Sequence, residues 1–288
     1  GKMRWESRAQ RELVVEGSSF ELEARLGTWV PGELELGTSG RFANGVSREF
    51  MDRVLDLCQG WGDWSATEGW REMHDFIFRI GNAQVRTTVG FDPATGEASS
   101  RTVHKKILKI RDYAYVPTIG TGPRLEFLAA DVRVALSEER VIQEESLPEW
   151  GPGRVPLRVR IKQRRSFYYT PARTDGKGWA AGEASGLPKE ESPEGSGEGG
   201  SKETAVWRFD FTLVWSARTL AQAQALQHTA EPEFELECEC MDPKNYLARE
   251  ADDRAVAEGL LLKLRDFLEP WGGYRLVVAP KMARKQSP

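Results

Sequence analysis

The segment FELEARLG, residues Phe20 to Gly27, alternates apolar and polar side chains along its length. Successive side chains of an extended strand point to opposite faces, so the segment predicts a strand with one apolar and one charged face. The apolar face would carry Phe20, Leu22, Ala24 and Leu26. The charged face would carry Glu21, Glu23 and Arg25. One face of this strand is therefore rich in carboxylates.

A second segment, EFELECEC at Glu233 to Cys240, repeats the pattern, with Cys238 and Cys240 on the apolar face. Its charged face would carry Glu233, Glu235, Glu237 and Glu239. One such strand is typical of an ordinary solvated face. Ionised carboxylates about 7 Å apart repel one another, and neither strand has interspersed lysines. A bound cation and a solvated face are therefore equal alternatives, and oxygen ligands suit Mg²⁺ or Mn²⁺.

A third strand pattern, in PLRVRIKQRR, is basic, and the flanking Arg165 points to its other face. Its charged face would carry Arg158, Arg160, Lys162 and Arg164. Arginine and lysine bind phosphate through charge-assisted hydrogen bonds, so the row resembles an anion-binding surface. Taken alone, the row fits a basic outer face or a nucleic-acid patch better than a catalytic role.

Further period-two segments mix both signs of charge. They contribute Arg86, Lys105, Lys106, Lys109, Asp131, Arg133, Glu139, Arg208, Asp210 and Thr212. An open solvated sheet needs no matching of glutamate rows to arginine rows, whereas a closed barrel must neutralise the charges inside it. The sequence therefore predicts a mainly antiparallel β (α+β) fold, a barrel with a charged lumen and helices packed on its apolar outer face.

Helical patterns are fewer, and we expect helices at residues 47–58, 219–227 and 242–268. Residues 174–204 are rich in Gly, Ser, Pro and Glu, which predicts a flexible acidic insertion between two strands that pair with each other. Residues 1–288 would then form a single catalytic domain with that insertion.

Composition and the absence of known motifs limit the ligand classes, the compartment and the chemistry to be expected. The net charge of −4 argues against a general polyanion binder, and three cysteines cannot form a disulfide framework, which favours a reducing compartment. No apolar run approaches the roughly 18 residues of a membrane span, and the amino end is charged rather than signal-like, so no membrane association is expected. The sequence has no G-x-S-x-G, phosphate-binding loop or H-E-x-x-H motif, and no histidine is assigned a role.

Together, FELEARLG, VRIKQR, WRFDFT and FELECE resemble the metal-dependent RNA 5′-triphosphatases of mRNA capping in fungi, protozoa and some viruses. These enzymes belong to the triphosphate tunnel metalloenzymes. The resemblance runs from about Ser19 to Cys240 and rests on several weak motifs in the family's order. It implies a closed antiparallel tunnel of eight strands.

The resemblance also implies roles for the charged side chains. The metal ligands would be Glu21, Glu23 and Glu239. Catalytic residues would be Arg160, Lys162, Arg164, Arg208, Asp210, Glu235 and Glu237. Substrate-binding residues would be Arg86, Lys105, Lys106, Arg133, Arg158 and Thr212. Further candidates are Arg25, Glu139 and Glu233, the last of these peripheral, and the choices between Lys105 and Lys106 and between Glu138 and Glu139 stay open.

The implied activity is removal of the γ-phosphate from 5′-triphosphate RNA with Mg²⁺ or Mn²⁺, with hydrolysis of nucleoside triphosphates as a further activity. The implied partners are that RNA and an mRNA guanylyltransferase, with the protein a monomer or homodimer. A nuclear setting is expected, or the cytoplasm for a viral or cytoplasmic capping pathway. Two alternatives stay open: a tunnel enzyme acting on inorganic triphosphate or thiamine triphosphate, or on ATP as a cyclase, and an inactive module that binds polyphosphate or RNA ends.

Overall fold

The computed structural model describes residues 2–3, 13–30, 41–92, 94–117, 130–143, 155–170, 206–241, 260, 264 and 274–278. Its helices are α1 (Arg48–Gly60) and α2 (Leu220–Thr229). Its strands are β1 (Lys2–Met3), β2 (Leu13–Val30), β3 (Arg41–Asn44), β4 (Ala66–Ile80), β5 (Ala83–Phe91), β6 (Ala98–Pro117), β7 (Asp131–Ile142), β8 (Arg158–Tyr169), β9 (Trp207–Ala217), β10 (Glu233–Cys240) and β11 (Tyr274–Val278).

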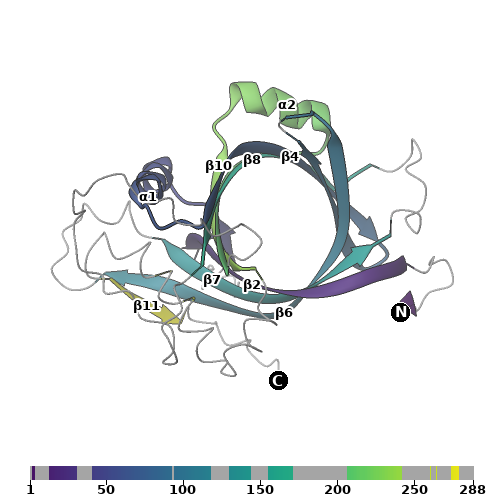
Figure 1. Cartoon of the computed structure of the whole chain (residues 1–288). Helices are drawn as coiled ribbons and strands as arrows, with labels where there is room; N and C mark the ends of the chain where they lie inside the picture. Colours follow the sequence, from purple (N-terminus) through teal and green to yellow (C-terminus); the bar gives the residue numbers. More distant parts are fainter. Residues whose placement is uncertain are drawn as a thin grey trace, which may run out of the picture.

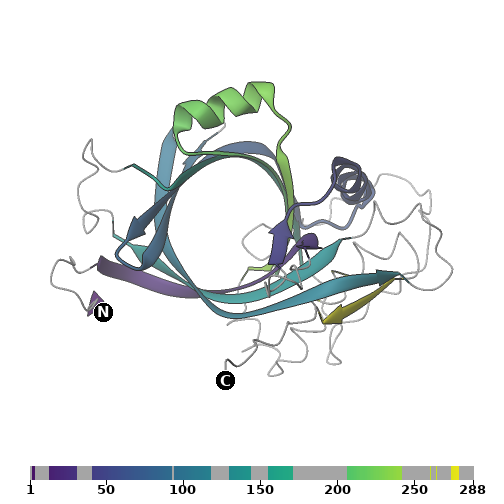
Figure 2. The same ribbon diagram turned by 180° about the vertical axis from the view of Figure 1, so that it is seen from behind.

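Eight strands close into an antiparallel barrel. They follow the order β2, β10, β9, β8, β4, β5, β6, and β7 closes the ring by pairing with both β6 and β2. Seen along its axis, the barrel is a closed ring of strands (Figures 1 and 2). The remaining strands attach to this ring, β1 and β3 to β2 and β11 to β6. The predicted closed eight-stranded barrel is confirmed.

The strands on either side of the acidic insertion pair with each other. Arg164 of β8 is opposite Thr212 of β9, and Tyr169 is opposite Trp207. This pairing was predicted from the two segments' strand patterns. The predicted insertion at 174–204 lies outside the described residues, so its flexibility stays a prediction.

The main hydrophobic core lies on the outside of the barrel wall. Buried side chains of the wall include Leu26 of β2 and Leu236 of β10. They pack with Phe50, Met51, Val54 and Cys58 of α1 and with Leu260 and Leu264. Cys238 and Cys240 are buried in the same core as free thiols. The prediction that both cysteines face the apolar side is therefore confirmed.

A second, smaller core lies under α2, which packs against the outer faces of β8 and β9. It consists of Val159, Ile161, Trp215 and Ala223, with Leu220 and Leu226 packed against them. Figure 1 shows both helices outside the ring of strands. Because these covered faces are apolar, strand alternation turns the charged faces of the same strands toward the lumen.

Both helices begin at hydroxyl caps. Ser47 Oγ accepts a hydrogen bond from Phe50 N at 3.1 Å, and Thr219 Oγ1 accepts one from Gln222 N at 3.2 Å. The predicted helix at 242–268 lies outside the described residues apart from Leu260 and Leu264, which are helical and buried. No helix in the described part of the chain has the length and apolar character needed to cross a membrane.

At one end of the barrel, β3 lies against β2 at a glycine. Gly27 is opposite Asn44, and Trp29 is opposite Phe42. A Cβ on Gly27 would lie against the carbonyl oxygen of Ala43 and 2.7 Å from Phe42 Cζ. Glycine is therefore needed at this position for the Phe42 ring to cover the strand.

We predict that Gly27→Ala lowers the free energy of unfolding by about 1–3 kcal/mol, because the backbone of β3 must move to admit the methyl group. Urea denaturation monitored by tryptophan fluorescence measures the change. Gly60→Ala is the control, since a Cβ there would meet no heavy atom within 4 Å. An equal loss of stability in both variants would contradict the close approach at Gly27.

Candidate active site

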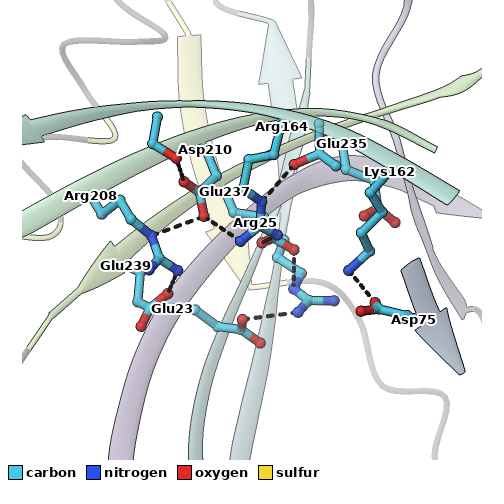
Figure 3. Close-up of polar contacts among 12 residues, drawn as sticks. Glu23, Arg25, Asp75, Lys162, Arg164, Arg208, Asp210, Glu235, Glu237 and Glu239 are labelled. Carbon is cyan, nitrogen blue, oxygen red and sulfur yellow. Dashed lines mark hydrogen bonds and ion pairs between the residues drawn. The ribbon is translucent and has the colours of Figure 1, made fainter. Parts of the chain in front are cut away.

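The register of the strands decides which charged side chains share the lumen. Glu237 of β10 is opposite Arg25 of β2 on one side and opposite Asp210 of β9 on the other. Asp210 is in turn opposite Ser166 of β8. Side chains at paired positions point to the same face, so four neighbouring strands present charged groups to one another across the lumen wall (Figure 3).

Glu237 lies between two arginines. Arg25 Nε is 3.1 Å from Glu237 Oε1, and Arg164 Nη2 is 3.5 Å from Glu237 Oε2. Burial alone would raise the pKa of Glu237, but these guanidinium groups hold it well below its usual range. Glu237 is therefore ionised at neutral pH.

Asp210 joins two further arginines. Its Oδ2 atom lies 2.9 Å from Arg164 Nη1 and 3.0 Å from Arg208 Nε, and its Oδ1 atom accepts a hydrogen bond from Ser166 Oγ at 2.7 Å. Arg164 Nε also donates to Thr212 Oγ1 at 3.2 Å. Arg208 forms a second ion pair with Glu239. The predicted residues of β8, β9 and β10 thus meet in one network (Figure 3).

Two more ion pairs extend the network along β8. Arg160 Nη2 lies 2.6 Å from Glu235 Oε1, and Lys162 pairs with Asp75 of β4. Burial lowers the pKa of Lys162 to about 8, although Asp75 opposes that shift. The pKa of Asp75 is lowered to about 2, because Lys162 and Arg86 outweigh the effect of burial.

Asp75 is a lumen residue that the sequence did not reveal. It is fully buried and also accepts a hydrogen bond from Thr88 Oγ1 at 2.7 Å. The available signal was period two in HDFIFRI, where Asp75 lies in phase with Ile77 and Arg79. Because Ile77 lies between Asp75 and Arg79 on this face, the sequence does not indicate a charged face. Only the pairing of β4 with β8 identifies Asp75 as a lumen residue.

On the opposite wall, Lys105 of β6 binds both glutamates of β2. Its Nζ atom lies 2.5 Å from Glu21 Oε2 and 3.1 Å from Glu23 Oε1. Lys106 is exposed and is opposite Glu138 in the register, so it lies outside the lumen. This corrects the prediction that placed Lys106 with the substrate-binding residues.

Of the two adjacent glutamates of β7, Glu139 joins the lumen. Glu139 Oε1 lies 3.1 Å from Arg86 Nη2, and Glu139 is buried. Glu138 instead pairs with Arg140 at 2.9 Å. The choice left open by the sequence therefore falls on Glu139.

Three predicted residues lie away from this network. Arg133 binds Asp112 through two contacts of 2.7 and 3.0 Å and lies over the Phe42 ring, 4.7 Å from its centroid. Arg158 and Glu233 are exposed near ends of their strands. Arg133 is thus occupied by protein groups, and the expectation that Glu233 is peripheral agrees with its exposure.

Carboxylates gather where β2 meets β10, and each has a cationic neighbour: Lys105 contacts Glu21 and Glu23, Arg25 contacts Glu23, and Arg208 contacts Glu239. Glu239 is opposite Glu23, and burial raises the pKa of both, with that of Glu239 reaching about 8. Nearby carboxylates, including Glu21 and Glu237, raise these pKa values further. A divalent cation with oxygen ligands would favour the ionised form of these carboxylates, so the donor chemistry fits Mg²⁺ or Mn²⁺. Within the described residues, no group of three or more His, Cys, Asp or Glu side chains forms a ready metal site.

Some arginine donors in the lumen have no protein acceptor. The Nε atoms of Arg86 and Arg160 are buried and make no hydrogen bond in the described part of the chain. Buried polar atoms are normally satisfied, so these groups suit a polar ligand or water inside the barrel.

Comparison with known proteins agrees with this architecture. No protein-family model and no curated protein matches the chain. The structure of the S. pombe RNA triphosphatase Pct1 is similar, with a TM-score of 0.52 at 13% identity, covering 88% of this chain and 86% of that one. A second structure of Pct1, in complex with the Spt5 CTD, gives 0.51 at 14% identity, with 88% and 87% covered. The chain therefore shares its fold, a closed antiparallel barrel, with this RNA triphosphatase, as the sequence motifs predicted.

We predict that Asp75→Asn lowers the free energy of unfolding by about 3 kcal/mol at pH 7, because Lys162 loses its buried partner. The folded-state pKa of Asp75, about 2, lies below the ordinary value of 3.8. Its stabilising effect is therefore present above about pH 4 and lost as the pH falls toward 2, so the difference between the two proteins should shrink over that range. Urea titrations at several pH values measure it.

Glu231→Gln is the control, because its pair with Arg48 is exposed and should change stability by less than about 1 kcal/mol. A difference between wild type and Asp75→Asn that stays constant from pH 7 to pH 2 would rule out the ionised Asp75–Lys162 pair.

Proposed function

We propose that the protein hydrolyses the terminal phosphoanhydride of 5′-triphosphate RNA, releasing phosphate and leaving a diphosphate end. The observation that carries this proposal is the meeting of Arg160, Lys162, Arg164 and Arg208 with buried carboxylates inside a closed barrel. A charged barrel interior enclosed by strands suits a chain end, since the body of an RNA can stay outside.

The cationic side chains would bind the phosphoryl oxygens. Arg164 now contacts the carboxylates of Asp210 and Glu237, and Arg160 contacts Glu235. Phosphate oxygens can replace carboxylate oxygens at a guanidinium group, since both accept parallel hydrogen bonds. The arginines and Lys162 would thereby neutralise the charge on the transferred phosphoryl group.

The glutamates of β10 would orient the attacking water. Glu237 keeps its charge because Arg25 and Arg164 favour the ionised form, so it can accept a hydrogen bond from water. Glu235 lies two residues away on the same face and is buried beside Arg160. Phosphoryl transfer needs positioning and charge stabilisation more than covalent help, which these side chains can provide.

We assign the metal site to Glu21, Glu23 and Glu239. These side chains line the region where the pKa values of Glu23 and Glu239 are raised by burial and by neighbouring carboxylates. Bound Mg²⁺ or Mn²⁺ would stabilise charge on the γ-phosphate. Lys105 and Arg208, which now contact these glutamates, would keep the remaining carboxylate charge balanced.

Three features favour an RNA end over a small triphosphate and over an inactive binder. The tunnel fold is shared with an RNA triphosphatase. The first strand has Arg25 after its two glutamates, where tunnel enzymes acting on small triphosphates usually show lysine. A pure anion binder would gain nothing from Glu23 and Glu239, which repel a phosphate in the absence of a cation. A capping role, with a guanylyltransferase consuming the product in the nucleus, follows from this activity and is part of the proposal.

We predict that Glu23→Gln and Glu237→Gln each reduce metal-dependent phosphate release by about 10²–10⁴-fold, because each variant removes a charge that acts on the phosphoryl group or its water. Release from γ-labelled 5′-triphosphate RNA, with Mg²⁺, with Mn²⁺ and with neither, measures the effect. Glu138→Gln is the control, since Glu138 pairs with Arg140 outside the lumen. Unchanged turnover in either lumen variant would defeat the proposed site.

Substrate comparison tests the choice of RNA. We predict a higher kcat/KM for 5′-triphosphate RNA than for tripolyphosphate or thiamine triphosphate, because the RNA adds binding groups beyond the triphosphate. Parallel phosphate-release assays with the three substrates give the order. A clear preference for either small substrate would move the assignment to another tunnel enzyme.

A further inference from the structure

Two arginines face the lumen yet remain half exposed. Arg71 of β4 is opposite Arg164, and Arg101 of β6 is opposite Thr88, so both share the face that carries the lumen network. Their side chains are 46% and 57% exposed, whereas that of Arg164 is 20% exposed. They therefore lie on the lumen face of the wall but nearer to solvent than the buried network.

Both arginines lie at the same end of the barrel. β4 and β6 each run antiparallel to β5, so their beginnings, which hold Arg71 and Arg101, lie together. Gly90 of β5 is opposite Met73 of β4 and Ser99 of β6, and it adds no side chain to the wall between the two arginines. A ligand leaving the lumen at this end would pass between them.

Arg101 continues a series of groups that starts inside the lumen. Glu139 is held by Arg86 at 3.1 Å and by Arg101 at a longer 3.6 Å. Arg86 is 32% exposed, so exposure increases from Arg86 to Arg101. An anion that took the place of Glu139 at Arg86 could move on to Arg101 and stay beside a cationic side chain throughout.

On the other side of Gly90, Arg71 extends the line of cationic side chains that begins at Arg164 in the lumen. It is directly opposite Arg164, which belongs to the lumen network, and its own carboxylate partner Glu68 lies 3.4 Å away. Glu68 is shared, because it also accepts a hydrogen bond from Tyr168 Oη at 2.9 Å. Arg71 is thus loosely held and able to bind an incoming anion.

The opposite end of the barrel is arranged differently. β2 runs parallel to β6, since β7 lies antiparallel to both, so Gly27 near the end of β2 lies at the other end of the barrel. There the Phe42 ring covers Gly27, and Arg133 is held by Asp112 and by that ring. Arg133 is therefore already occupied here. Arg79 and Arg158 are exposed near the end of β4 and the start of β8, but neither forms an ion pair with a lumen carboxylate among the described residues.

We propose that Arg71 and Arg101 bind the first phosphodiester groups of the RNA, and that the RNA body leaves the tunnel at the end where β4 and β6 begin. The inference rests on the proposed function and adds the side of entry and the residues that distinguish RNA from a bare triphosphate. A tripolyphosphate, held within the lumen network, has no atoms that reach beyond it to these arginines.

The test compares substrates in steady-state assays with the full chain, using Arg71→Ala, Arg101→Ala and the double variant. A short 5′-triphosphate RNA and tripolyphosphate serve as substrates. Each single change should lower the ratio of kcat/KM for RNA over kcat/KM for tripolyphosphate by about tenfold, mainly through the KM for RNA, because one charge-assisted phosphate contact is lost. The slope of log kcat/KM for RNA against log salt should fall by about one for each arginine removed.

Arg79→Ala is the matched control, because Arg79 lies on the same strand and is exposed near its other end. It should leave the ratio unchanged. Equal losses on both substrates in the Arg71 and Arg101 variants, or a lowered ratio in Arg79→Ala alone, would overturn the side of entry.

Binding of 5′-triphosphate RNA and 5′-hydroxyl RNA, followed by fluorescence anisotropy without added metal, separates the two proposals. Wild-type protein that cleaves tripolyphosphate but neither binds nor cleaves the triphosphate RNA would overturn the proposed function together with this inference. Protein that cleaves the RNA, with an unchanged KM in the double variant, would overturn this inference alone.

Discussion

The structure depends on neutralising charge inside a closed barrel. Once β7 pairs with both β2 and β6, the charged faces of the strands cannot turn to bulk water, and each buried ion needs a partner. Glu237 illustrates the result, since Arg25 and Arg164 approach it from two different strands. The protein's own carboxylates therefore occupy the arginines, and a phosphate entering the lumen competes with them.

Neutralisation is uneven along the lumen. Around Glu237 the positive charge is sufficient to lower the carboxyl pKa despite burial, whereas the pKa of Glu239 rises to about 8 because burial and other carboxylates outweigh Arg208. One region thus favours anions and the neighbouring region favours cations. This arrangement suits a complex of a triphosphate with a divalent metal, which brings both signs of charge together.

The same alternation that fills the lumen also builds the outer core. Leu236 and Cys238 separate the glutamates of β10 and pack outward under α1, while Ile161 of β8 and Trp215 of β9 pack under α2. A charged substitution on the outer face and an apolar one on the inner face should therefore both lower stability. The outer face of each strand packs in the core, and its inner face takes part in the ion pairs. The helices stabilise the barrel, and their packing fixes which face becomes the lumen.

The sequence by itself determined the strand patterns, both described helices, the barrel with a charged lumen and, through the motif resemblance, its eight strands. These follow from local periodicity, since a period of two separates Glu21 and Glu23 from Leu22 without any knowledge of neighbours. Only the tertiary structure decided which groups meet. It paired Asp75 with Lys162 and placed Lys105, not Lys106, beside Glu21 and Glu23. It also assigned Arg133 to Asp112 and Phe42. Such pairings depend on strand order and register, and a shift of one residue exchanges the two faces, which a single strand's pattern cannot detect.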